Sequence, residues 1–451
     1  MRAVPVQGTA QPQPTLNLFD AVTMIVGIVV GAGIFKAPSI VAGSVSSAEV
    51  FIGLWVAGGV ISLIGALCYA ELGSAFPNAG GEYYFLTRAF GRWVGFFFAW
   101  ARMSVIQTGA IAAIAFVFGD YATQLFSIGP RSSVIYAALA VVGITALNIS
   151  GTRGSKTLQN ILTVALACAI LGVILAGLGG TGAAPAAQAA GAASGPMFSQ
   201  LALIFILLTY GGWNEAAYLT AEIQDARRNI VRALVLGILI VTVLYVLLNL
   251  AYVNVLGLDG MKASRAVAAD LMKATLGAAG AAVLSLIVIS AALTTLNATV
   301  FTGARTNYAV GRDFRIFGAL GNWKESSNAP VNALLFQGAV ALVLVLLASF
   351  TPDGFETMVT YTAPAFWLFF MLTGISLFVL RWQQPLSDKP FRVPLYPLTP
   401  ALFIAMCAFM LYSSASYAMS KNPSSLGAQL GIGVLLLGAP LALVARKRVT
   451  H

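Results

Sequence analysis

Two glycine clusters interrupt long apolar runs, and their backbone groups are well suited to bind a small molecule. Gly31 and Gly33 lie in the segment GIVVGAGIFKAP, and Gly211 and Gly212 lie in TYGGWNE. Where a helix unwinds inside a bilayer, its N–H and C=O groups need new partners. The N-terminus of a half-helix favours a carboxylate, and free carbonyls at a C-terminus favour an ammonium group. Together the two breaks predict a binding site for a zwitterion such as an α-amino acid.

Charged residues close to these breaks are candidates for coupling or gating, because an ionisable group at membrane depth is costly. Lys36 follows the first cluster, Glu215 follows the second, and Arg102 lies within another apolar run. We expect Glu215 to form the polar floor of the site or to pair with Arg102 or Lys36. The alternative is a structural ion pair remote from the substrate. Glu71 and Glu222 are expected to pair with each other or with loop residues.

The residues that most enzymes need are scarce. The single histidine is the last residue, His451, which leaves no internal histidine for a metal site or a catalytic triad. Glu215 and Glu222 share one apolar run but are about two helical turns apart, too far for paired acid–base work on one atom. The three cysteines lie inside apolar runs and form no CxxC pair: Cys68, Cys168 and Cys407. The sequence therefore argues against an enzyme and indicates no firm metal site.

Composition places these features in a membrane protein. Of 451 residues, 59% are hydrophobic and 9% are charged, whereas about a quarter are charged in soluble domains. A helix needs about 20 apolar residues to cross the hydrocarbon core. The sequence predicts an all-α integral membrane protein with twelve transmembrane helices, near 17–46, 49–76, 93–126, 132–150, 157–179, 197–222, 231–256, 278–304, 330–350, 355–380, 397–419 and 427–445.

The net charge of +10 is explained by membrane orientation. With the N-terminus inside, most basic residues fall in cytoplasmic loops, as the positive-inside rule requires. Both termini are therefore expected in the cytoplasm, and nucleic acid is not expected as a partner. The few basic residues left for the outer side are Arg131, Lys262, Arg265, Lys273 and Lys421. Residues 1–16 are predicted to form a disordered cytoplasmic tail, and 180–196 an extracellular loop.

Five separated motifs resemble the amino acid–polyamine–organocation superfamily, and most closely its L-type amino acid transporter branch with its bacterial relatives. The motifs are GAGIF (31–35), YAELGSAFPNAGGEYYFL (69–86), YGGWN (210–214), RRNIVRAL (227–234) and KPFRVPLYPLTP (389–400). The resemblance implies a LeuT-type fold and alternating access. Helices 1–5 (17–179) and 6–10 (197–380) would form inverted repeats with helices 1 and 6 discontinuous. Residues 381–451 would add two helices and a basic cytoplasmic tail.

The same resemblance implies which residues bind substrate. Tyr210 and Trp213 would form an aromatic wall or gate over the substrate side chain. Ala32 stands where relatives often have serine, and Leu208 replaces a family phenylalanine, so the substrate preference is expected to differ. The expected binding set is Val29, Gly31, Ala32, Gly33, Leu208, Tyr210, Gly211, Gly212, Trp213 and Asn214.

Coupling is expected to depart from many relatives, which carry a lysine in the fifth helix where this chain has Leu166. Ser290, Thr294 and Thr295 in the eighth helix could supply oxygen ligands for Na⁺. The alternative is that these hydroxyls bond back to helix carbonyls. No cofactor is expected beyond Na⁺ or H⁺ as a coupling ion. The loop 127–133 lacks the cysteine that joins animal relatives to a glycoprotein, so no disulfide-linked ancillary subunit is expected.

These patterns predict a secondary active transporter for L-amino acids, most simply neutral ones, working as an exchanger or an ion-coupled symporter. We expect a monomer or weak homodimer in the lipid bilayer of the plasma membrane, the bacterial inner membrane. One alternative is a carrier of cationic amino acids or polyamines, favoured if Glu215 faces the pocket. A second, of another class, is an amino-acid sensor or channel on the same scaffold.

Overall fold

The computed structural model describes residues 16–78, 80–150, 156–179, 198–219, 223–324, 329–383 and 391–445. The predicted tail 1–16, except Leu16, and the predicted loop 180–196 lie outside these residues, as do Glu222 and the basic residues after 445.

The described residues form helices and no strand. The helices are α1 (Leu18–Val29), η1 (Ala32–Phe35), α2 (Ala37–Ala42), α3 (Ala48–Ala75), α4 (Gly81–Phe90), α5 (Arg92–Ala101), η2 (Arg102–Ile106), α6 (Gln107–Leu125), α7 (Ser132–Ile149), α8 (Lys156–Gly179), α9 (Gln200–Thr209), η3 (Trp213–Glu215), α10 (Ala216–Leu219), α11 (Ala226–Ala263), α12 (Val267–Asp313), η4 (Arg315–Gly321), α13 (Val331–Ala348), α14 (Gly354–Gln383), α15 (Leu398–Ala418) and α16 (Ser425–Val444).

Nine of the described helices are long and apolar enough to cross a membrane. Of the other three predicted spans, two are broken into shorter helices and one is a single helix of 24 residues. The first is divided among α1, η1 and α2, the sixth among α9, η3 and α10, and the fifth is α8. The prediction of an all-α membrane protein is thus confirmed, and the first and sixth spans are the interrupted ones.

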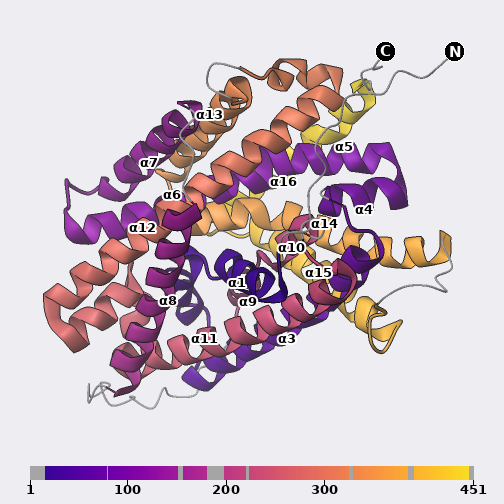
Figure 1. Cartoon of the computed structure of the whole chain (residues 1–451). Coiled ribbons are helices and arrows are strands. Elements are labelled where there is room, and N and C mark those ends of the chain that lie inside the picture. Colours follow the sequence, from indigo (N-terminus) through magenta and orange to yellow (C-terminus); the bar gives the residue numbers. More distant parts are fainter. Residues whose placement is uncertain are drawn as a thin grey trace, which may run out of the picture.

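The two interrupted spans lie near the centre of the bundle, with α1 and α9 next to each other in Figure 1. On one side α11 packs along α3 and contacts α1, and on the other α12 packs against α6. Glycine allows this close approach, because a Cβ on Gly58 of α3 would collide with the side chain of Ile206 in α9. The interrupted spans are therefore enclosed by continuous helices.

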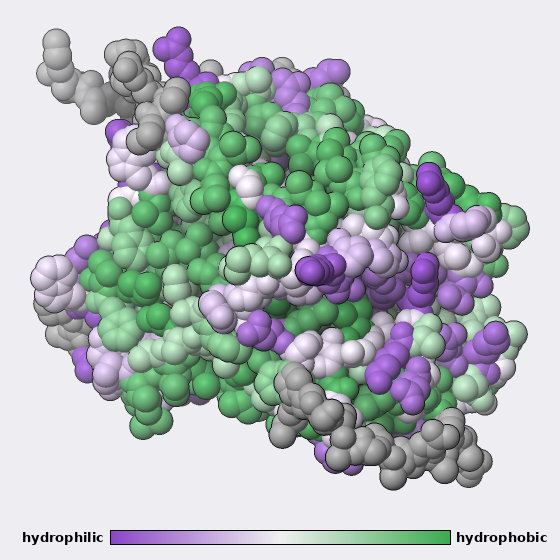
Figure 2. Space-filling view, turned by 180° about the vertical axis from the view of Figure 1, so that it is seen from behind, coloured by the Kyte–Doolittle hydropathy of each residue, from purple (hydrophilic) through white to green (hydrophobic). Residues whose placement is uncertain are grey.

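The outside of the bundle is apolar, as a lipid-facing surface requires. Figure 2 shows apolar residues over much of one face. Large side chains such as Leu175 and Phe350 are 71% and 74% exposed. Such exposure would favour aggregation in water but is satisfied by lipid.

Glycine also sets the ends of two spans. Gly257 and Gly277 have φ of 63° and 73°, a left-handed backbone that interrupts α11 and α12. The predicted spans end at 256 and begin at 278, next to these glycines, whereas α12 extends beyond the predicted end at 304. The segment between the two glycines forms a short helical hairpin at one end of the bundle.

Candidate functional site

The first break begins where α1 ends at Val29. Gly31 has an extended backbone (φ −95°, ψ −172°), and the chain then forms the 3₁₀ turn η1 before α2. At the gap itself, the N–H of Gly31 donates to the carbonyl of Val29 in a tight turn rather than continuing the helical pattern. The break therefore leaves a helix C-terminus and a new helical N-terminus facing one another.

The second break lies at Gly212, whose φ of 108° is in the region that only glycine adopts readily. A Cβ at this position would lie 3.2 Å from the carbonyl oxygen of Ile28 in α1. A Cβ on Gly33 would lie 3.9 Å from the side chain of Thr209. The two breaks are therefore adjacent, and we call residues 29–33 with 209–214 the central junction.

A tyrosine from a third helix joins the two half-helices. The hydroxyl of Tyr245, in α11, lies 2.9 Å from the carbonyl oxygen of Val29 and 3.2 Å from that of Thr209. These carbonyls belong to the last residues of α1 and α9, where acceptors have no donor one helical turn later, although the carbonyl of Val29 also accepts from the N–H of Gly31. Tyr245 is fully buried, so the hydroxyl replaces water at both ends. No spacing pattern in the sequence distinguished this tyrosine from others in apolar runs.

Replacing Tyr245 with phenylalanine is expected to lower the free energy of unfolding by about 1–3 kcal/mol, because buried carbonyls lose a donor. Thermal unfolding in detergent measures this change. Tyr252→Phe is the matched control, since that hydroxyl, in the same helix, is buried and has no hydrogen-bond partner in the described structure. We expect the control to be neutral or stabilising. Equal destabilisation by both variants would contradict the assigned role of the Tyr245 hydroxyl.

The predicted aromatic pair contacts other rings around the junction. Tyr210 is fully buried, and its hydroxyl donates to the carbonyl of Trp55 in α3. Trp213 packs edge-on against Tyr69, with ring centroids 5.1 Å apart. The side-chain oxygen of Asn214 accepts from the N–H of Gly212 at 3.3 Å, which supports the second break. Leu208 and Gly211 lie in the same segment, and nothing is described of the Ala32 side chain.

Glu215 pairs with Arg102, one of the two partners expected for it. The guanidinium Nη2 lies 3.2 Å from Oε2 of Glu215, and Nη1 lies 3.9 Å from Oε2 of Glu82. Arg102 begins η2, a π-helical turn, and such turns often occur at functional sites. Tyr69 donates a hydrogen bond to Glu82. We call Arg102, Glu82 and Glu215 the Arg102 cluster, in which carboxylates outnumber guanidinium groups.

Lys36 does not pair with Glu215 but with two aspartates that the sequence motifs did not single out. Its Nζ lies 2.9 Å from Asp120 Oδ2 and 2.9 Å from Asp353 Oδ2. It also donates to the carbonyl of Arg265 at 3.3 Å. Lys36 is only 1% exposed, so this charge is removed from water. We call Lys36, Asp120 and Asp353 the Lys36 cluster.

Asp353 precedes α14 and is held ionised. Burial acts to raise the pKa of its carboxyl, but the Lys36 ammonium and a hydrogen bond from the N–H of Glu356 outweigh this effect and lower the pKa below its usual value. The carboxylate is therefore charged at neutral pH and holds Lys36 electrostatically.

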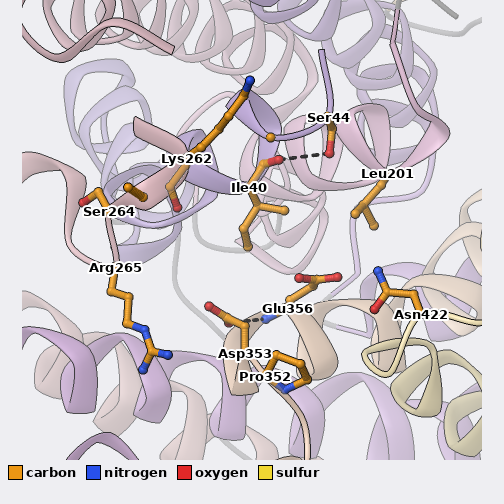
Figure 3. A pocket seen from close by; sticks show the side chains of 13 residues that line it. Ile40, Ser44, Leu201, Lys262, Ser264, Arg265, Pro352, Asp353, Glu356 and Asn422 are labelled. Atoms are coloured by element: carbon orange, nitrogen blue, oxygen red, sulfur yellow. Dashed lines mark hydrogen bonds between the residues drawn. The ribbon is translucent and has the colours of Figure 1, made fainter. Parts of the chain in front are cut away.

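A chamber of about 390 Å³ adjoins the Lys36 cluster. Its wall is formed by α2, by the start of α9, by the segment between α11 and α12, and by the start of α14 (Figure 3). Asp353 and Glu356 lie side by side on this wall (Figure 3). Asp353 thus faces the chamber and also binds Lys36.

The three hydroxyls of the eighth span that were predicted as sodium ligands bond within their own helix. Ser290 donates to Leu286 and Thr294 to Ser290, while Thr295 donates to Ala291, each one turn earlier. Their oxygen lone pairs remain available, so a sodium site is still a prediction. The part of the chain that the structure describes holds no group of three His, Cys, Asp or Glu residues arranged for a metal.

Glu71 has a structural role near the C-terminal end of α3. Its carboxylate accepts two hydrogen bonds from Arg381, at 2.7 and 2.5 Å, and a third from the N–H of Val393 at 2.7 Å. It thereby joins α3 to the end of α14 and to the segment that precedes α15. The acid of YAELG and the FRVP segment are therefore in direct contact.

Comparison with known proteins agrees with the resemblance seen in the sequence. The model of the amino acid permease family matches residues 16–436. The chain is 30% identical over 411 residues to b(0,+)-type amino acid transporter 1 of Mus musculus, covering 89% of this chain and 83% of that protein. It is 31% identical over 441 residues to Large neutral amino acids transporter small subunit 2 of Homo sapiens, covering 94% and 79%. Because the family match spans most of its length, this chain belongs to the amino acid permease family and is a permease rather than an enzyme.

Proposed function

We propose that this permease is a secondary active transporter that moves neutral L-amino acids across the plasma membrane by alternating access. The central junction carries this proposal. α1 and α9 end at the junction, where the negative ends of their dipoles favour an ammonium group, and η1 and η3 begin there, where N–H groups favour a carboxylate. An α-amino acid supplies both groups on one carbon. The similarity to transporters named for amino acids supports the same substrate class.

Asymmetry of charge supports the orientation. The chamber then lies on the outer side of the membrane. The end of the helical bundle that carries Arg88, Arg92 and Arg312 lies on the cytoplasmic side. The proposal includes twelve spans with both termini inside, arranged as a LeuT-type pair of inverted repeats. The described loop 127–133 contains no cysteine, so the chain works without a disulfide-linked subunit, as a monomer or weak homodimer. Transport is either exchange or symport with Na⁺ or H⁺.

A cationic amino acid or polyamine is the second candidate substrate. The observation in its favour is the Arg102 cluster, where two carboxylates face one guanidinium next to the second break. The side chain of Glu215 is 38% exposed, so a positive group on a substrate could approach it. Neutral substrates remain the proposal because Arg102 already lies within hydrogen-bonding distance of Glu215.

A radiolabelled uptake panel in proteoliposomes tests both candidates. Leucine, lysine and putrescine are compared in vesicles with and without internal unlabelled amino acid, and with Na⁺ or pH gradients. We expect saturable leucine uptake, accelerated by internal amino acid if the protein exchanges. Preference for lysine or putrescine would favour the second candidate, and absence of any flux would favour a sensor. Identical uptake with and without a Na⁺ gradient would end the proposal of sodium at Thr294 and Thr295.

A further inference from the structure

Hydrogen bonds connect the backbone of Lys36 to the turn at the first break and to α2. Its backbone N–H donates to the carbonyl of Gly33 at 3.0 Å, and its carbonyl accepts from the hydroxyl of Ser39 at 2.9 Å. Gly33 belongs to η1 and Ser39 to α2. Any force on the Lys36 side chain therefore acts on both the turn at the break and the short helix that follows it.

The partners of Lys36 are fixed to other helices. Asp120 lies near the end of α6 and accepts a hydrogen bond of 2.7 Å from Ser133 at the start of α7. Asp353 accepts from the N–H of Glu356 at 2.9 Å and so is held by α14. These two anchors are far from α2 in the sequence. The Lys36 cluster is thus a connection between the first interrupted span and two uninterrupted ones.

Lys36 links the chamber wall to the junction along the chain. Ser39 and Asp353 line the chamber, whereas Gly33 lies beside Thr209 in the junction. Lys36 lies between Gly33 and Ser39 in the chain and is almost fully buried. A movement of α2 away from α6 and α14 would separate Lys36 from its aspartates.

We propose that Asp120 and Asp353 are positioning residues of the transport cycle, which through Lys36 hold α2 closed over the central junction on the chamber side. The proposal rests on the proposed function for its direction of opening. In this conformation the cluster is intact, so the junction is closed to the chamber. Opening requires the three side chains to separate and to be hydrated by chamber water.

Loss of the ammonium group should open this side strongly. Without Lys36, the buried carboxylate of Asp120 and the partly exposed carboxylate of Asp353 would face each other without the ammonium group that joins them, which favours their separation and hydration. Loss of one aspartate should open the junction to the chamber side less than loss of Lys36 does, because Lys36 would stay paired with the other aspartate. The order of effects is therefore Lys36→Met above Asp120→Asn or Asp353→Asn.

The test measures access to the junction from outside intact cells. A reporter cysteine replaces Thr209 in a chain in which Cys68, Cys168 and Cys407 are replaced by alanine. A membrane-impermeant thiol reagent is added, and the labelling rate is compared among variants. We expect Lys36→Met to raise the rate about tenfold or more, a shift of at least about 1.4 kcal/mol. Lys36→Arg, which keeps the charge, should stay close to the parent.

Lys262→Met is the matched control. Lys262 also lines the chamber, but it is paired with the exposed Asp259 at 3.3 Å and lies outside the cluster. We expect its labelling rate to be unchanged. If Lys36→Met is poorly folded by gel filtration, the two asparagine variants carry the test, each with a smaller increase. Rates equal to the parent in all folded cluster variants would overturn the proposal.

The readout separates this proposal from the proposed function. Labelling needs no transport, so a parent chain that moves no amino acid but shows the predicted rates would refute the function and keep the gate. A parent chain that transports leucine while Lys36→Met leaves labelling unchanged would refute the gate alone. A positioning role also predicts that Lys36→Met changes the half-saturation concentration for outside substrate, whereas Lys262→Met does not.

Discussion

Replacing Arg102 with methionine is expected to lower the free energy of unfolding by about 3–5 kcal/mol and to abolish transport. Arg102 is the cation that lies beside both Glu82 and Glu215. The side chain of Glu82 is only 4% exposed, so its carboxylate would stay buried while losing this cation. Glu215 would lose the group that positions it next to the second break. Thermal unfolding in detergent and leucine counterflow measure the two effects.

Two further variants test why stability is lost when Arg102 is replaced. Arg102→Lys keeps the charge but loses the planar donor geometry, so we expect partial recovery of stability. Arg88→Met removes an exposed guanidinium that lies 5.1 Å from the ring centre of Phe76, and we expect a loss below about 1 kcal/mol. An Arg102→Met protein that unfolds like the parent would show that the carboxylates do not depend on this arginine.

Gly33→Leu is expected to reduce transport by about a hundredfold or more while the protein still folds. A Cβ at Gly33 makes only an ordinary contact, 3.9 Å from Thr209, so the fold tolerates a side chain there. The longer leucine chain would occupy the space beside η1 where the substrate must approach the backbone. A hundredfold loss of flux corresponds to about 2.8 kcal/mol, which is the free energy that the substrate would need to displace the leucine side chain.

Gly53→Leu is the matched control for adding the same side chain. Gly53 lies on α3, is exposed on the bundle surface, and a Cβ there would have nothing within 4 Å. Leucine there would meet lipid, and we expect parental flux and stability. Undiminished leucine counterflow by a folded Gly33→Leu protein would exclude Gly33 from the substrate path.

The breaks could be predicted from the sequence because their cause is local. Clustered glycines weaken a helix, because glycine has a low helix propensity and readily adopts non-helical backbone conformations, but composition alone does not decide the outcome, since Gly58 and Gly59 lie inside the continuous helix α3. The positive φ of Gly212 and the extended backbone of Gly31 follow from that chemistry. Gly257 and Gly277 are single glycines, and the positive φ that each adopts ends a span in the same way.

The ion clusters were only half predictable. A charge within an apolar run needs a partner of opposite charge, so the sequence predicts that Lys36 and Glu215 are each part of an ion pair. Which partner they choose depends on how distant helices meet. Asp120 and Asp353 stand near the ends of apolar runs, where the sequence alone makes them resemble ordinary loop charges. Only the fold brings them to within 2.9 Å of Lys36.

Tyr245 shows the same limit for a neutral residue. Its hydroxyl is important here because it meets two carbonyls that only the breaks leave without helical partners. Tyr252 lies two turns away in the same helix and has an equally apolar sequence environment, but its hydroxyl has no such partner in the described residues. The difference is created by α1 and α9, which are distant in sequence.

Competition for leucine counterflow is the sharpest test of the proposal that the central junction binds the α-amino and α-carboxyl groups of one substrate. The competitors are L-leucine, D-leucine, isoamylamine, which lacks the carboxylate, and 4-methylpentanoate, which lacks the ammonium group. We predict strong inhibition by L-leucine alone. Equal inhibition by L-leucine and isoamylamine would contradict the proposal, because the carboxylate would then contribute nothing to binding.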